Sequence, residues 1–105
     1  MADLVPGTLE MMILKTLLNG AMHGYGIAQR IQNASADVLT VEEGSLYPAL
    51  QRLLRKGWVT AEWGKTGLNR RARFYKLTRD GRKQLGVEME EFRRITRAIE
   101  SVLEG

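Results

Sequence analysis

The side chains that could do chemistry in this sequence are mainly cations and hydrogen-bond donors. Residues 44–83 contain eleven Lys and Arg and two acidic residues, a net charge of +9, while the rest of the chain carries −5. Charge concentrated in this way favours contact with a polyanion, although a charge run alone is usually only a solvated face. Polar side chains that could hydrogen-bond to base edges lie in the same segment: Ser45, Tyr47, Gln51 and Arg52. The segment therefore predicts a double-stranded DNA partner.

Recognised arrangements for catalysis or metal binding do not occur in the sequence. There is one histidine, His23, and no cysteine, which excludes disulfides and thiolate sites. Glu42 and Glu43 are adjacent and would not converge on one site. Residues 64–67 are not followed by the Gly-Lys-Ser/Thr of a phosphate-binding loop. The sequence thus predicts no enzyme, metal or cofactor, and His23 is expected to be a loop or capping residue.

The composition is that of a small globular protein. The chain has 105 residues, of which 44% are hydrophobic and 27% are charged, which favours a single domain with an appended helix. Its start lacks the basic and apolar regions of a secretory signal. No apolar stretch approaches the length of a membrane span. We therefore expect a cytoplasmic protein with no membrane partner.

One helix is expected to position the groups that face DNA. Over residues 41–57, leucines at 46, 50, 53 and 54 fall on one face, and the opposite face is small, polar and cationic. Ser45 is expected to cap this helix, which would place Pro48 in its first turn, and Gly57 to end it. The leucine face should be buried, and Pro48 could offer apolar contact to a thymine methyl.

Two further helices are expected before it, over residues 9–18 and 24–33. The first is apolar almost all round, which predicts burial on more than one side. Tyr25 is expected to pack at the start of the second, and residues 39–41 are a candidate for a very short strand. The second helix and the helix over residues 41–57 would then form a helix-turn-helix, whose second helix enters the major groove.

A hairpin is expected to follow. Residues 58–63 and 72–77 alternate in polarity and are rich in β-formers. They flank a loop that contains two glycines and an asparagine. We expect this hairpin to be a wing, with three cations near its tip that contact the phosphate backbone: Lys65, Arg70 and Arg71.

A long helix is expected over residues 79–103. Its apolar residues form an a/d seam of about three heptads. Packing on its own domain could bury this seam, but we favour a homodimer, because residues 9–18 also have apolar surface to spare. The prediction is a mostly α, α+β fold, with a winged helix-turn-helix domain at 1–78 and a dimerisation helix at 79–105. The dimerisation residues would be Leu85, Met89, Phe92, Ile95, Ile99 and Leu103.

Four motifs together resemble the PadR family of bacterial transcriptional regulators. They occur in family order and cover much of the chain: HGYGI at 23–27, GSLYPAL at 44–50, NRRARFY at 69–75 and LTRDG at 77–81.

The resemblance implies a winged helix-turn-helix homodimer that regulates, and usually represses, transcription. It assigns DNA contacts to the recognition helix and the wing, at Ser45, Tyr47, Pro48, Arg70 and Arg71. Some members bind flat aromatic effectors between their C-terminal helices, so the resemblance places a small aromatic effector near Phe92. The alternative is a winged-helix module that binds proteins and not DNA. Such modules usually lack a basic recognition face, so the +9 segment argues against it.

Overall fold

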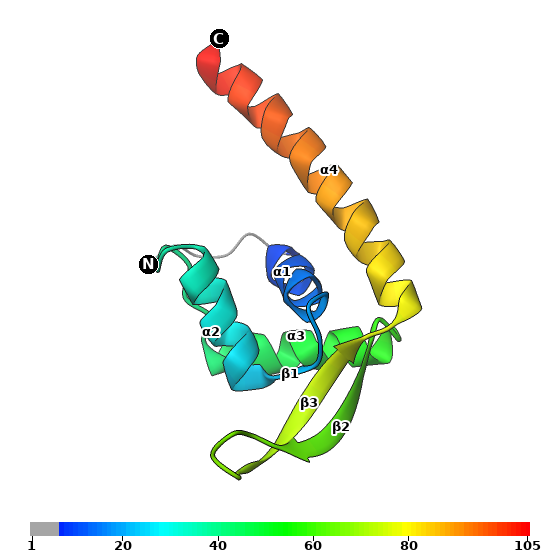
Figure 1. Cartoon of the computed structure of the whole chain (residues 1–105). Coiled ribbons are helices and arrows are strands. Elements are labelled where there is room, and N and C mark those ends of the chain that lie inside the picture. The colour runs from blue at the N-terminus through cyan, green and yellow to red at the C-terminus, as the bar shows by residue number, and fades with distance from the viewer. Residues whose placement is uncertain (1–6) are drawn as a thin grey trace.

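A computed structural model describes residues 7–105 of the chain. Residues 1–6, part of the predicted amino-terminal domain 1–78, lie outside the described residues. The fold consists of three helices, a small antiparallel sheet whose first strand lies between the first two helices, and a long final helix (Figure 1). The elements are α1 (Thr8–Leu17), β1 (Met22–His23), α2 (Gly24–Ala34), α3 (Glu43–Arg55), β2 (Val59–Lys65), β3 (Arg71–Leu77) and α4 (Arg79–Glu104).

The sheet has the strand order β1-β3-β2, with all neighbours antiparallel. Its short strand is not at the predicted residues 39–41, where the structure has no strand. That segment packs against the core, and the Leu39 amide donates to the Ser35 hydroxyl at 3.0 Å. The third strand is instead Met22–His23, whose residues pair with Tyr75 and Phe74 of β3.

The core lies between the first three helices and the base of the β2–β3 hairpin. The leucine face of α3 is buried as predicted, with Leu46, Leu50 and Leu53 almost fully enclosed and Leu54 partly enclosed. Helix α1 contacts α2, α3, α4 and β3, which confirms burial on more than one side. No helix in residues 7–105 is apolar over enough of its length to cross a bilayer.

Helix α3 begins earlier than predicted. Glu42 is its N-cap, and the Glu42 carbonyl accepts hydrogen bonds from the amides of Ser45 (3.0 Å) and Leu46 (2.9 Å). Ser45 therefore lies inside the first turn and is not the cap. Pro48 falls in the second turn, where it has no N–H to donate to the Gly44 carbonyl. Residue 44 is exposed, so this position is not enclosed by apolar side chains.

Helix α4 is anchored to the base of the hairpin at its start and leaves the domain at its end (Figure 1). Thr78 caps it as expected, because its hydroxyl accepts from the Gly81 amide at 3.0 Å. The same hydroxyl donates to the Gly57 carbonyl at 2.8 Å. Leu85 is only 3% exposed and packs in the core of its own domain, so its prediction as a dimerisation residue is corrected. Met89 also packs partly against that core.

Candidate nucleic-acid interface

The outer face of α3 is a polar and cationic strip. Pro48, Gln51 and Arg55 are three and four residues apart, and all three are exposed, so they share one side of the helix. The strip has no acidic side chain after Glu43 in the first turn. Arg55 is not among the predicted site residues, although its spacing from Gln51 places it on this face.

Tyr47 lies at the edge of that strip and is held by α2. A Cβ at residue 24 would come within 3.0 Å of the Tyr47 hydroxyl oxygen and 3.1 Å of its ring. Gly24 thus leaves the space that the tyrosine ring occupies. A side chain at residue 24 would therefore displace the Tyr47 ring, which is 43% exposed in this position.

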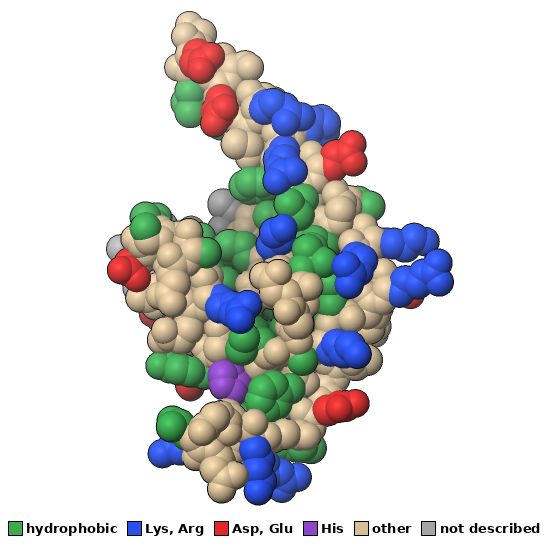
Figure 2. Space-filling view, viewed as in Figure 1, with side chains coloured by type: hydrophobic (Ala, Val, Ile, Leu, Met, Phe, Trp, Pro, Cys, Tyr) green, Lys and Arg blue, Asp and Glu red, His purple; other side chains and the backbone are tan. Residues whose placement is uncertain are grey.

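The hairpin tip is a tightly bonded turn. The Thr66 amide donates to the Arg70 carbonyl at 2.8 Å, and the Asn69 amide donates to the Thr66 carbonyl at 2.9 Å. Asn69 has a φ of 61°, a left-handed conformation that asparagine tolerates better than most residues. Figure 2 shows Lys and Arg side chains at this end of the molecule, at the bottom of the view. These hydrogen bonds fix the backbone of the turn, and therefore the positions from which the Arg70 and Arg71 side chains project.

An open cleft lies between α2, α3 and the hairpin, and four of the predicted site residues line it. The other predicted residues lie around it. Lys65 is exposed and pairs with Arg71 at the last step of the β2–β3 ladder. Ser45 and Pro48 are exposed on α3 but do not line the cleft. The four residues that the fold brings together are Tyr47, Gln51, Arg70 and Arg71.

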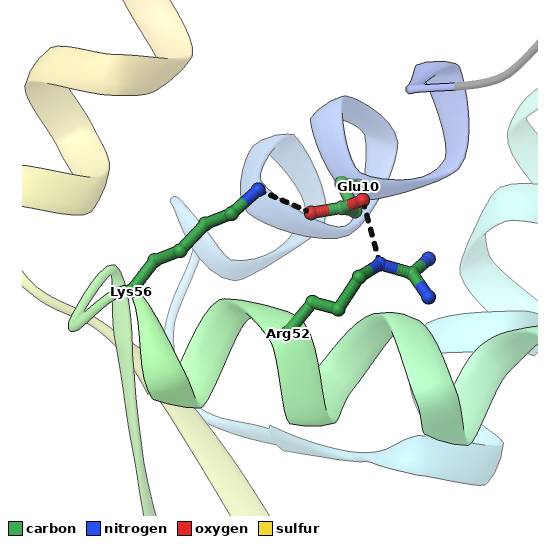
Figure 3. A network of polar contacts seen from close by, with 3 residues as sticks. All are labelled: Glu10, Arg52 and Lys56. Carbon is green, nitrogen blue, oxygen red and sulfur yellow. Dashed lines mark hydrogen bonds and ion pairs between the residues drawn. The ribbon is translucent and has the colours of Figure 1, made fainter.

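Arg52 does not join them. Its Nε donates to Glu10 Oε2 of α1 at 3.0 Å, and Lys56 Nζ lies 3.3 Å from the other carboxylate oxygen. Figure 3 shows both side chains reaching from α3 towards α1. Glu10 is 13% exposed, so this carboxylate is well screened from solvent. The structure thus corrects the placement of Arg52: it braces α3 against α1, and one of its donors is already bonded.

Two residues at the start of α2 also differ in their roles. His23 caps the helix as expected, because its Nδ1 accepts from the Gly26 amide at 2.9 Å. Tyr25 was expected to pack, but it is 69% exposed, and its hydroxyl accepts from Gln29 Nε2 at 3.0 Å. Tyr25 and Gln29 both line the cleft. Among residues 7–105, no three His, Asp or Glu side chains are grouped so as to hold a metal ion.

Glu88 of α4 lies near Glu10 of α1 and Lys56 at the end of α3. Burial, with a smaller contribution from the like charge of Glu10, raises the pKa of the Glu88 carboxyl above its ordinary value, and Lys56 opposes this shift. Its Oε2 is buried without a hydrogen-bond partner. A carboxylate in this position weakens the contact between α1 and α4 when it is ionised.

Replacing Glu88 with glutamine is expected to raise the melting temperature at neutral pH. Because the folded pKa is raised, the Glu88 proton favours the folded state below pH 4.5, and this contribution is lost as pH rises through the folded pKa. Thermal melts should therefore show a gain for Glu88→Gln at pH 7 that fades in acid. Glu90→Gln, at an exposed position on the same helix, is the control. An equal gain at every pH would show that ionisation is not its cause.

The fold and the cleft define a winged helix-turn-helix protein. Over residues 13–87 the chain matches the Transcriptional regulator PadR-like family. The chain belongs to this family and is a transcriptional regulator of the PadR-like type, which confirms the resemblance seen in its motifs.

Relatives of this chain span nearly its whole length. An "Uncharacterized protein X" of Lysinibacillus sphaericus is 28% identical over 104 residues, which cover 99% of this chain and 95% of that protein. A transcriptional regulator from Clostridium thermocellum has a TM-score of 0.85 at 26% identity, covering 95% of this chain and 97% of that one. A PadR family transcription regulator from Clostridium difficile has a TM-score of 0.77 at 25% identity, covering 92% and 99%.

Proposed function

We propose that this protein is a repressor that binds an inverted-repeat DNA operator as a homodimer. The observation that carries the proposal is the shared cleft, which places Gln51 of α3 and Arg71 of the hairpin on one side of the domain. The major groove of DNA is wide enough to admit one α-helix such as α3. With α3 in the groove, the hairpin would lie along the DNA backbone.

The two parts of the interface have different tasks in this proposal. The outer face of α3 reads base edges and fixes the sequence, through Ser45, Tyr47, Pro48 and Gln51. Arg55, exposed beside Gln51, joins them. The wing cations Lys65, Arg70 and Arg71 contact phosphates, which adds affinity without sequence information. Arg52 is left out, because its guanidinium is already bonded to Glu10 of α1.

A second copy of the chain is proposed to cover the end of α4. Phe92, Ile95, Ile99 and Leu103 form an exposed apolar stripe beyond the part of the helix that packs on the domain, and Val102 lies beside it. The part of α4 beyond Met89 comprises residues 90–104, and a helix segment of about this length is marginal in water without a partner. We therefore propose residues 79–105 as the dimerisation helix. Phe92 would be the aromatic contact for a small flat effector between the two helices.

Selection of bound fragments from genomic DNA, followed by fluorescence anisotropy on the strongest fragment, tests this function. We expect tight binding to an inverted repeat whose half-sites are one helical turn, or a multiple of it, apart. The logarithm of the affinity should fall with the logarithm of salt by about 0.9 per phosphate contact. No binding at micromolar protein and low salt would contradict the proposal and favour a protein-binding module.

A further inference from the structure

Trp63 is a large apolar side chain that the fold does not bury. It is 62% exposed, although the hairpin around it is regular. Along β2, Val59 and Ala61 share a face with Trp63, and their partners Leu77 and Tyr75 pack against the core. The hairpin extends beyond the core, so the same face carries Trp63 out into the cleft that Gln51 lines. The position is therefore set by the sheet, and core packing does not explain a tryptophan there.

Arg71 lies directly against this tryptophan. Its guanidinium carbon is 4.5 Å from the centre of the Trp63 ring, which is within the range of a cation–π contact. Within the described part of the chain, Arg71 forms no ion pair with an acidic side chain. Trp63 is thus the group that orients the Arg71 side chain.

The contrast with Arg52 shows what this arrangement provides. Glu10 occupies a donor of Arg52 and offsets its charge. An aromatic ring can hold a guanidinium by its flat face, which leaves the charge intact and the N–H groups at the edge free. A phosphate accepts two parallel hydrogen bonds from such an edge. Arg71 is therefore held in place and is still able to bind an anion.

We propose that Trp63 is a positioning residue that holds Arg71 ready to clamp a DNA phosphate at the wing. The proposal rests on the proposed DNA-binding function and deepens it, because that function by itself assigns no role to Trp63. In this account Trp63 acts through Arg71 and does not add an independent DNA contact.

A double-mutant cycle on the selected DNA fragment tests the proposal. Trp63→Leu is expected to lower affinity about 2- to 5-fold, the equivalent of an exposed cation–π contact. Arg71→Ala should lower it further and reduce the salt dependence by about one phosphate contact. In the Arg71→Ala background, Trp63→Leu should have no additional effect. Trp63→Phe, which keeps an aromatic face, should retain most of the wild-type affinity.

The matched control replaces Arg70, a neighbouring wing cation for which the structure shows no aromatic partner in residues 7–105. The effects of Trp63→Leu and Arg70→Ala should simply add. Thermal melts of every variant check that the fold is kept, and Trp63→Thr, which also removes the ring, serves as the test if Trp63→Leu does not fold. Additive effects of Trp63 and Arg71, or no effect of Trp63, would overturn this inference while leaving DNA binding intact. A wild-type protein that does not bind DNA would overturn the proposed function itself.

Discussion

Replacing Ile99 with glutamate is expected to separate the proposed dimer and to lower operator affinity by about 10²- to 10⁴-fold, the gain that joining two binding modules provides. Ile99 is 54% exposed in the single chain, so the fold of each subunit should tolerate a charge there. In a dimer, the same charge would lie in an apolar seam between two helices, where an unpaired carboxylate is strongly unfavourable. Analytical ultracentrifugation and anisotropy on the selected fragment measure both effects.

Ser101→Glu is the matched control. It adds the same charge to α4 at an exposed position on roughly the opposite side of the helix from Ile99. This variant should stay dimeric and lose little affinity beyond the small effect of one added negative charge. A dimeric Ile99→Glu protein that binds the operator as tightly as the wild type would show that this stripe is not the interface.

Replacing Gly81 with alanine is expected to destabilise the fold by about 1–3 kcal/mol, which is the usual effect of overpacking. A Cβ at this position would lie 2.0 Å from the Trp58 carbonyl oxygen. This oxygen belongs to the backbone, so it cannot avoid the clash by a change of side-chain rotamer. Either α4 or the start of β2 would have to move. The Thr78 amide, which donates to the same oxygen at 3.0 Å, would then lose its bond. Thermal or urea unfolding measures the loss.

Gly86→Ala provides the comparison within the same helix. A Cβ there would meet no atom within 4 Å, so only the higher helix propensity of alanine remains, and stability should rise by about 0.5–1 kcal/mol. Opposite signs at the two glycines would separate a steric requirement at residue 81 from a general effect of glycine on α4. A stabilised Gly81→Ala protein would contradict the close approach of α4 to β2.

Elements whose sequence patterns are local could be predicted from the sequence alone. The leucine spacing of α3, the alternation of the hairpin strands and the Thr78 cap depend on residues within a few positions of one another, and each was predicted correctly in kind. The start of α3 was misplaced because Ser45 is a better cap by type than Glu42, while the backbone bonds decide the boundary. The strand at Met22–His23 exists only because β3 lies beside it.

Contacts between distant segments account for the errors at the site. Arg52 belongs to the polar face of α3 by its spacing, but its partner Glu10 lies 42 positions earlier in the chain. Leu85 continues the heptad pattern into the part of α4 that the domain itself buries, so periodicity could not separate core from interface. The pairing of Trp63 with Arg71 depends on strand register across the hairpin, which no local pattern specifies.

The division of labour between α3 and the wing is tested most directly by comparing Gln51→Ala with Arg70→Ala on the selected fragment and on a scrambled copy. The account predicts that Gln51→Ala lowers the preference for the selected fragment by about 1–3 kcal/mol, while Arg70→Ala weakens binding to both fragments alike and reduces the salt dependence by about one phosphate contact. Equal weakening of both fragments by both variants would contradict it.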